Sequence, residues 1–127
     1  MNETVSEWVV KAEGDYRVAV RELAVTDQPS FDAVCFHAQQ CIEKLLKAAL
    51  IQQGVVPPRV HDLAELSRLL AAARSDWGWS LPELRRLSQS AVDARYPGSL
   101  ATQAEAEAAV AICTRLRERL RALLGAE

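Results

Sequence analysis

A helix-start signal that recurs along the chain is the feature that most constrains its fold. Four times a serine, threonine or aspartate stands three residues before a glutamate, and apolar residues at helical spacing follow. In this arrangement the two side chains bond amide groups that have no partner at the start of a helix. The four pairs are Thr4 with Glu7, Asp62 with Glu65, Ser80 with Glu83, and Thr102 with Glu105.

Apolar periodicity between these signals predicts five helices. They run from about Val5 to Ala24, from Phe31 to Gln53, from near Asp62, from Leu81 to Val92, and from Gln103 to Leu124. The stretches TDQPS, VVPPR, SDWGWS and DARYPGS separate them. No alternating apolar and polar run predicts a strand. We therefore expect one all-α domain over residues 1–127, an antiparallel up-and-down bundle of four to five helices.

The inward faces of these helices follow from the same spacing. The predicted core residues are Trp8, Val9, Ala12, Tyr16, Ala19, Val20 and Leu23 in the first helix; Val34, Ala38, Cys41, Ile42, Leu45 and Ala49 in the second; Leu63, Leu66, Leu69, Leu70 and Ala73 in the third; and Ala109, Val110, Cys113, Leu116, Leu120 and Leu123 in the last.

Composition is that of an ordinary soluble domain. Of 127 residues, 50% are hydrophobic and 25% charged, which is enough to bury a core without disulfides or a structural metal. The net charge of −2 does not call for a nucleic-acid partner. We expect Cys35, Cys41 and Cys113 to be reduced and buried, and we expect no metal and no cofactor. No signal peptide or membrane span is visible, so a cytoplasmic protein is expected.

Several functional classes lack their motifs. The chain has no glycine-rich phosphate loop, no dinucleotide-binding fingerprint and no nucleophile elbow. The arginines of RLRERLRALL alternate with core leucines beside acidic residues. That pattern predicts a charged outer face or a weak dimer seam before it predicts a nucleic-acid surface.

A polar stripe on the second helix carries the first candidate site residues. His37, Gln40, Lys44 and Lys47 fall on one arc of the helix, with His37 at its border with the apolar arc. The stripe is either a solvated face or the lining of a groove that accepts an anion such as phosphate.

Two loops carry the other candidates. His61 stands just before a helix start, where an imidazole is either structural or a proton carrier. Arg95 and Tyr96 precede a Pro–Gly turn, which fixes the angle at which they leave the helix. Arg95 either pairs with Asp93 or another helix, or offers its planar fork to a phosphate.

Taken together, these pieces resemble the HEPN family, the higher-eukaryote and prokaryote nucleotide-binding domain. The resemblance rests on WVVKAEGDYRVAVREL, CFHAQQCIEKLLKAAL, HDL after a proline-containing loop, and ARYPG before the last helix, and it covers nearly the whole chain. It implies a helical bundle that commonly forms a homodimer. It also implies a minimal nucleotidyltransferase as a possible partner, often in a toxin–antitoxin pair.

Many members of the family are metal-independent ribonucleases with an arginine four to six residues before a histidine. Here Arg95 occupies the arginine position, but Leu100, Ala101 and Thr102 stand where the histidine is expected. General acid–base cleavage of RNA needs a group that carries a proton near neutral pH. That activity would require the fold to bring His61 or His37 to Arg95.

We therefore expect a binding module for a nucleotide or for a partner nucleotidyltransferase rather than an enzyme. The predicted ligand-binding residues are Lys44, Lys47, His61, Arg95, Tyr96, His37 and Gln40. The alternative is a ribonuclease toxin with a remodelled site that uses Arg95 and His61, with RNA as its substrate. A third possibility is that these polar groups are all structural and that the chain only dimerises.

Overall fold

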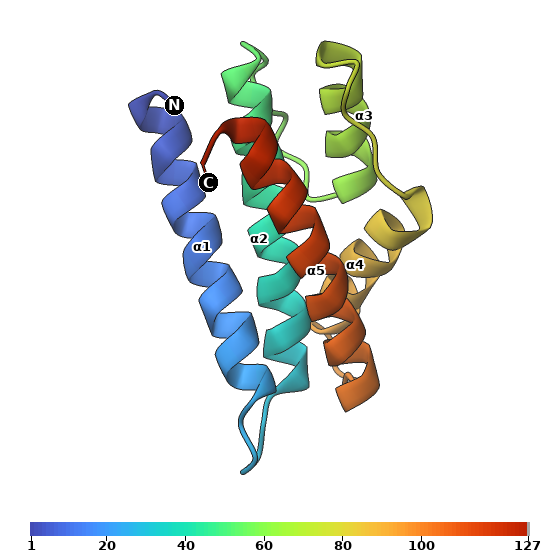
Figure 1. Cartoon of the computed structure of the whole chain (residues 1–127). Helices are drawn as coiled ribbons and strands as arrows, with labels where there is room; N and C mark the ends of the chain where they lie inside the picture. The colour runs from blue at the N-terminus through green and yellow to red at the C-terminus, as the bar shows by residue number, and fades with distance from the viewer. Residues whose placement is uncertain (127) are drawn as a thin grey trace.

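The computed structural model of the chain describes residues 1–126 and consists of five α-helices joined by short connections (Figure 1). They are α1 (Glu3–Leu23), α2 (Phe31–Gln52), α3 (Leu63–Ala73), α4 (Leu81–Asp93) and α5 (Gln103–Leu124). No strand occurs among these residues. The prediction of an all-α bundle is confirmed. None of the five helices is both long and apolar enough to cross a membrane.

The helix starts confirm part of the capping prediction. At α5 the complete reciprocal pair forms: the Thr102 hydroxyl accepts from the Glu105 amide at 3.1 Å, and the Glu105 carboxylate accepts from the Thr102 amide at 3.0 Å. At α3 and α4 the cap residues Asp62 and Ser80 each accept a backbone N–H, but the glutamate does not bond back. Glu83 instead accepts from arginine and tryptophan side chains.

The predicted start of α1 was wrong. Asn2 caps this helix, because its side-chain oxygen accepts from the Val5 amide at 2.8 Å. Asparagine is at least as good a cap as threonine, and the helix begins with it, two residues before the predicted cap Thr4.

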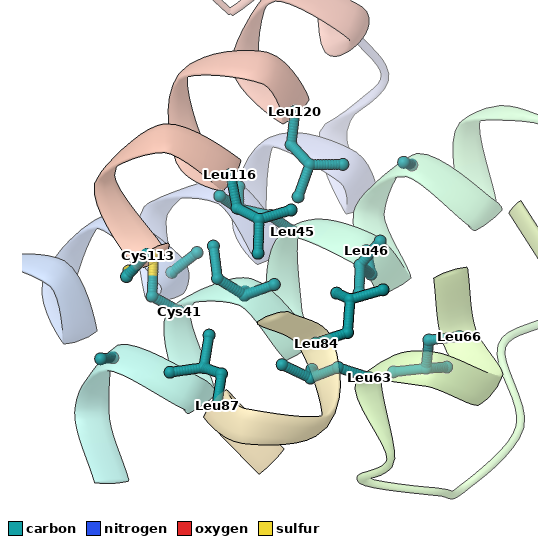
Figure 2. Packing of buried hydrophobic residues seen from close by; sticks show 14 of the residues in the cluster. Cys41, Leu45, Leu46, Leu63, Leu66, Leu84, Leu87, Cys113, Leu116 and Leu120 are labelled. Carbon is teal, nitrogen blue, oxygen red and sulfur yellow. The ribbon is translucent and has the colours of Figure 1, made fainter. Parts of the chain in front are cut away.

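The central helix of the bundle is α2, which packs against each of the other four helices. The whole predicted apolar arc of α2 is buried, and Figure 2 shows its leucines meeting side chains from α3, α4 and α5. Burying one such leucine contributes about 1.5–3 kcal/mol. Because α2 is covered on nearly every side, its polar residues Gln39, Glu43 and Lys47 are buried as well. Two core predictions in other helices were wrong, since Val20 and Ala73 are exposed.

The direction of the chain explains how α2 becomes enclosed. In Figure 1, α1 descends and α2 ascends beside it. The loop after α2 descends to the start of α3, which ascends again, and the connection after α3 together with α4 then returns the chain to the lower end. Helix α5 then runs up along α2 in the same direction as α2. Helices α3 and α4 also carry the connection between α2 and α5, so their ends form the surroundings of the candidate site.

The break between α3 and α4 is packed rather than loose. Trp77 is buried, and its indole N–H donates to the Ser67 hydroxyl at 3.0 Å. Its ring stacks on Trp79 with centroids 6.3 Å apart. These contacts hold α4 at a fixed angle to α3.

The three cysteines are buried and free, as expected. Burial raises the pKa of Cys35 to about 11, and the adjacent Cys113 thiol together with burial raises the pKa of Cys41 well above its usual range. Figure 2 shows Cys41 of α2 beside Cys113 of α5 in the core. These thiols act as small apolar side chains.

Candidate functional site

A ladder of polar side chains runs along the buried part of α2. Gln39, Glu43 and Lys47 are four residues apart, so they lie one above another on the same helix face. Glu43 is 4% exposed and is the centre of the group. A buried carboxylate is costly unless donors surround it, and this one is well supplied.

The donors around Glu43 come from two elements. Within α2, its Oε1 accepts from the Gln39 amide at 3.1 Å and its Oε2 accepts from the Lys47 ammonium at 3.1 Å. From the loop before α3, the Nδ1 atom of His61 lies 3.0 Å from Oε1 and 3.1 Å from Oε2. Burial raises the pKa of Glu43, but the hydrogen bonds from Gln39, His61 and Lys47 outweigh it. The pKa therefore lies below the usual value, and the carboxylate is ionised.

Amide groups fix the position of the loop that carries His61. The Gln39 side chain donates to the His61 carbonyl at 2.9 Å, and its own oxygen accepts from Gln40 at 2.9 Å. Both the backbone and the imidazole of His61 are thus tied to α2, which orients a side chain that is itself 66% exposed.

A second buried carboxylate organises the rest of the polar stripe. Asp15 of α1 is 7% exposed; it lies 2.8 Å from Nδ1 of His37 and accepts from the Lys44 ammonium at 2.5 Å. This cluster joins α1 to α2. The edge of the Phe36 ring packs on His37, with ring centroids 5.3 Å apart.

A cavity of about 420 Å³ opens beside the Glu43 cluster, between α2, the start of α3 and α4. Two arginines face it, Arg85 of α4 and Arg95 of the loop after α4. Neither has a carboxylate within ion-pair distance among residues 1–126. Arg95 lies over the Phe36 ring, 5.3 Å from its centroid, rather than against Asp93. The lining of the cavity also includes Gln39, His61, Asp62 and Ser88.

The structure brings some of the predicted site residues together and separates others. His61 and Arg95 line the same cavity. Lys47 and Gln40 belong to the Glu43 cluster, while Lys44 and His37 are held by Asp15. None of these four lines the cavity. Tyr96 follows Arg95 in the chain and is 64% exposed. The proposed binding roles of these residues stay predictions.

Sequence reasoning did not name five residues of these clusters as site residues: Asp15, Gln39, Glu43, Arg85 and Ser88. Asp15 lies between Ala12 and Ala19 at helical spacing, which marks it as buried. Arg85 and Ser88 share a face of α4 with Val92, at intervals of three and four residues. That spacing could have identified the helix face that leads to Arg95.

The C-terminal arginines are engaged within the chain. Arg117 and Arg121 both bond Glu13 of α1, at 2.7 Å and 2.8 Å, and Arg115 bonds Glu83 of α4 at 2.6 Å. Burial raises the pKa of Glu13, but its two arginine partners outweigh burial, so the pKa lies below its usual value. This surface is the charged outer face expected from RLRERLRALL.

The chain is an all-α helical-bundle domain, with an enclosed second helix and a polar cavity at its α3–α4 side. The model of the HEPN domain family matches residues 5–123, and the chain belongs to that family. No curated protein matches the sequence.

Two solved structures have the same fold. The crystal structure of TT1696 from Thermus thermophilus has a TM-score of 0.78 and 22% identity, over 97% of this chain and 99% of that one. The crystal structure of ST0689, described as an archaeal HEPN homologue, has a TM-score of 0.70 and 22% identity, over 96% and 98% of the two chains. At this identity the likeness concerns the fold alone.

Proposed function

We propose that the chain is a binding module for a phosphorylated ligand of the nucleotide class, held in the cavity between α2, α3 and α4. The observation that carries this proposal is that Arg85, Arg95 and His61 line one cavity, while neither arginine forms an ion pair among residues 1–126. Asp62 lines the same cavity but pairs with neither of them. Two unpaired guanidinium groups facing one hollow are suited to an anion.

The chemistry of the lining fits a phosphate. A guanidinium donates two parallel hydrogen bonds to phosphate oxygens, and this geometry is stronger and more specific than a single point charge. The Ser88 hydroxyl accepts from the Leu63 amide at 3.1 Å, so its own hydrogen is free to donate. Tyr96 follows Arg95 in the chain, and its exposed aromatic ring is suited to stack on a base.

The other predicted ligand residues act indirectly in this proposal. Lys47 and Gln40 support the Glu43 cluster, and Lys44 and His37 support the α1–α2 contact. HEPN membership also supports a homodimer and a minimal nucleotidyltransferase partner. The exposed apolar side chains of Val92 and Leu100, close in sequence to Arg95, are available for either contact.

Isothermal titration with adenosine nucleotides tests the proposal. We expect binding by the wild-type chain and at least a tenfold loss of affinity in Arg85→Gln and in Arg95→Gln, since each removes a charge-assisted pair. Arg17→Gln is the matched control, because Arg17 is an exposed arginine of α1 outside the cavity. No binding by the wild type, or equal losses in the control, would refute the proposal.

A ribonuclease with a remodelled site is the second candidate. It is favoured by one observation, that the fold brings His61 and Arg95 to the same cavity although they are 34 positions apart (95 minus 61). An imidazole and a guanidinium supply a proton carrier and charge stabilisation for phosphodiester cleavage.

Incubation of single-stranded RNA with the protein in a chelator decides between the candidates. Cleavage that is lost in His61→Gln and Arg95→Gln but retained in His37→Gln would establish the ribonuclease. If the RNA stays intact while the protein binds nucleotides, the ribonuclease is excluded and the binding module is supported.

A further inference from the structure

The two partners of the contact between Glu43 and His61 differ in their exposure to solvent. The carboxylate is buried, whereas most of the imidazole is exposed and lines the cavity. Both carboxylate oxygens lie within 3.1 Å of the same ring atom, Nδ1. The other ring nitrogen, Nε2, has no hydrogen-bond partner among residues 1–126.

The protonation state of Nδ1 follows from its neighbours. An ionised carboxylate accepts hydrogen bonds and donates none, so Nδ1 must carry the hydrogen. The charge of Glu43 is already matched by Lys47 at 3.1 Å, so His61 need not be cationic to satisfy it. A neutral imidazole with hydrogen on Nδ1 has its lone pair on Nε2.

We propose that Glu43 is a positioning residue that holds His61 with Nε2 as a hydrogen-bond acceptor, so that the site selects a phosphorylated ligand carrying a neighbouring hydroxyl. This inference rests on the proposed function, since the arginines hold the phosphate while Nε2 accepts the hydroxyl. A ribonucleoside 3′-phosphate has that combination, with its 2′-hydroxyl on the adjacent carbon. Its 2′-deoxy counterpart lacks only the hydroxyl.

His37 provides an internal comparison. Its Nδ1 also contacts a buried carboxylate, at 2.8 Å from Asp15, but the ring does not line the cavity. The chain has two histidines, so both imidazoles can be assigned from the single variants His37→Gln and His61→Gln.

The first test reads the tautomer in the protein without ligand. Long-range ¹H–¹⁵N spectra of the neutral imidazole should show Nδ1 of His61 protonated and Nε2 bare. In Glu43→Gln combined with Lys47→Met, which leaves no unpaired buried charge, the amide can donate to Nδ1 and the tautomer should reverse. Glu65→Gln, a change at an exposed glutamate paired with Arg68, should leave it unchanged. Hydrogen on Nε2 in the wild type would overturn the inference.

The second test compares adenosine 3′-phosphate with its 2′-deoxy form by calorimetry. One hydrogen bond of ordinary net strength gives roughly a three- to tenfold preference for the ribose form. The preference should vanish in the double variant and persist in Glu65→Gln. Equal binding of both probes by the wild type would overturn the hydroxyl contact alone. Binding of neither probe would overturn the hydroxyl contact and the proposed function together, and the tautomer would then be a structural feature.

Discussion

Two buried carboxylates, Asp15 and Glu43, have nearly the same partners but different surroundings. Each contacts a lysine ammonium and Nδ1 of a histidine. The Asp15 cluster joins α1 to α2, and none of its members lines the cavity. The Glu43 cluster holds a loop histidine that does line it, in the company of two arginines.

In the proposed function, the same ionic chemistry serves two purposes. A carboxylate, a lysine and a histidine stabilise a helix contact when all three bond only one another. We propose that they form part of a site when one member lines a cavity, as His61 does. The neighbours of a polar cluster therefore decide its role, and each of the following changes tests that distinction.

The largest effect is expected for Glu43→Ala. The change leaves Lys47 buried without a carboxylate, and breaking a buried pair by removing one partner costs about 3–5 kcal/mol. Urea unfolding followed by circular dichroism measures the loss, and adding Lys47→Met should recover part of it. A loss smaller than about 1 kcal/mol, which is typical of any point substitution, would contradict the central place of Glu43.

Asp15→Asn should have a smaller effect on stability and none on the cavity. Hydrogen bonds to charged groups contribute about 1.5–3 kcal/mol, and the partly exposed Lys44 and His37 retain access to water. We expect a loss of about 2 kcal/mol by urea unfolding, with nucleotide affinity unchanged. Weaker binding in a folded variant would mean that the two clusters are not functionally separate.

Acid should weaken the fold through its buried carboxylates. The pKa of Glu43 is lower in the folded chain than its ordinary value of 4.5. Its contribution is therefore fully present above that ordinary value, and it is lost as the pH falls through the lower, folded-state pKa. Urea titrations over this acidic range should show that the free energy of unfolding falls less steeply with falling pH in Glu43→Gln than in the wild type. A second variant, Glu13→Gln, should also reduce the pH dependence of the free energy of unfolding, since the pKa of Glu13 is lowered too. Parallel curves for the wild type and Glu43→Gln would show that the cluster does not depend on the ionised form.

The smallest effect is expected for Arg115→Gln. This arginine pairs with Glu83 on the surface, and exposed ion pairs contribute about 0–1 kcal/mol. The loss should shrink further in high salt, which screens exposed charges. A loss as large as that of Asp15→Asn would remove the contrast between buried and exposed pairs.

The helices were readable from the sequence because their signals are local. Thr102 and Glu105 lie three residues apart, so their reciprocal cap depends on nothing else in the chain. The apolar arc of α2 was readable for the same reason. The start of α1 was misplaced because Asn2 and Thr4 are both good caps, and spacing alone does not choose between them.

The site was only partly readable because its contacts join distant elements. The stripe of Lys44 and Lys47 was predicted to be a solvated face or the lining of a groove, but Lys47 is buried against Glu43 and Lys44 pairs with Asp15. These partners depend on how α1 docks and on how tightly α2 is enclosed. His61 and Arg95 were identified by residue type. Their meeting at one cavity, and the presence of Arg85, follow from the angle between α3 and α4, which a one-dimensional pattern does not contain.

A crystal structure with bound adenosine 3′-phosphate tests the central claim most directly. We expect the phosphate between the guanidinium groups of Arg85 and Arg95, with the 2′-hydroxyl within hydrogen-bond distance of Nε2 of His61. A phosphate seated against Lys44 and His37, with the α2–α4 cavity empty, would contradict it.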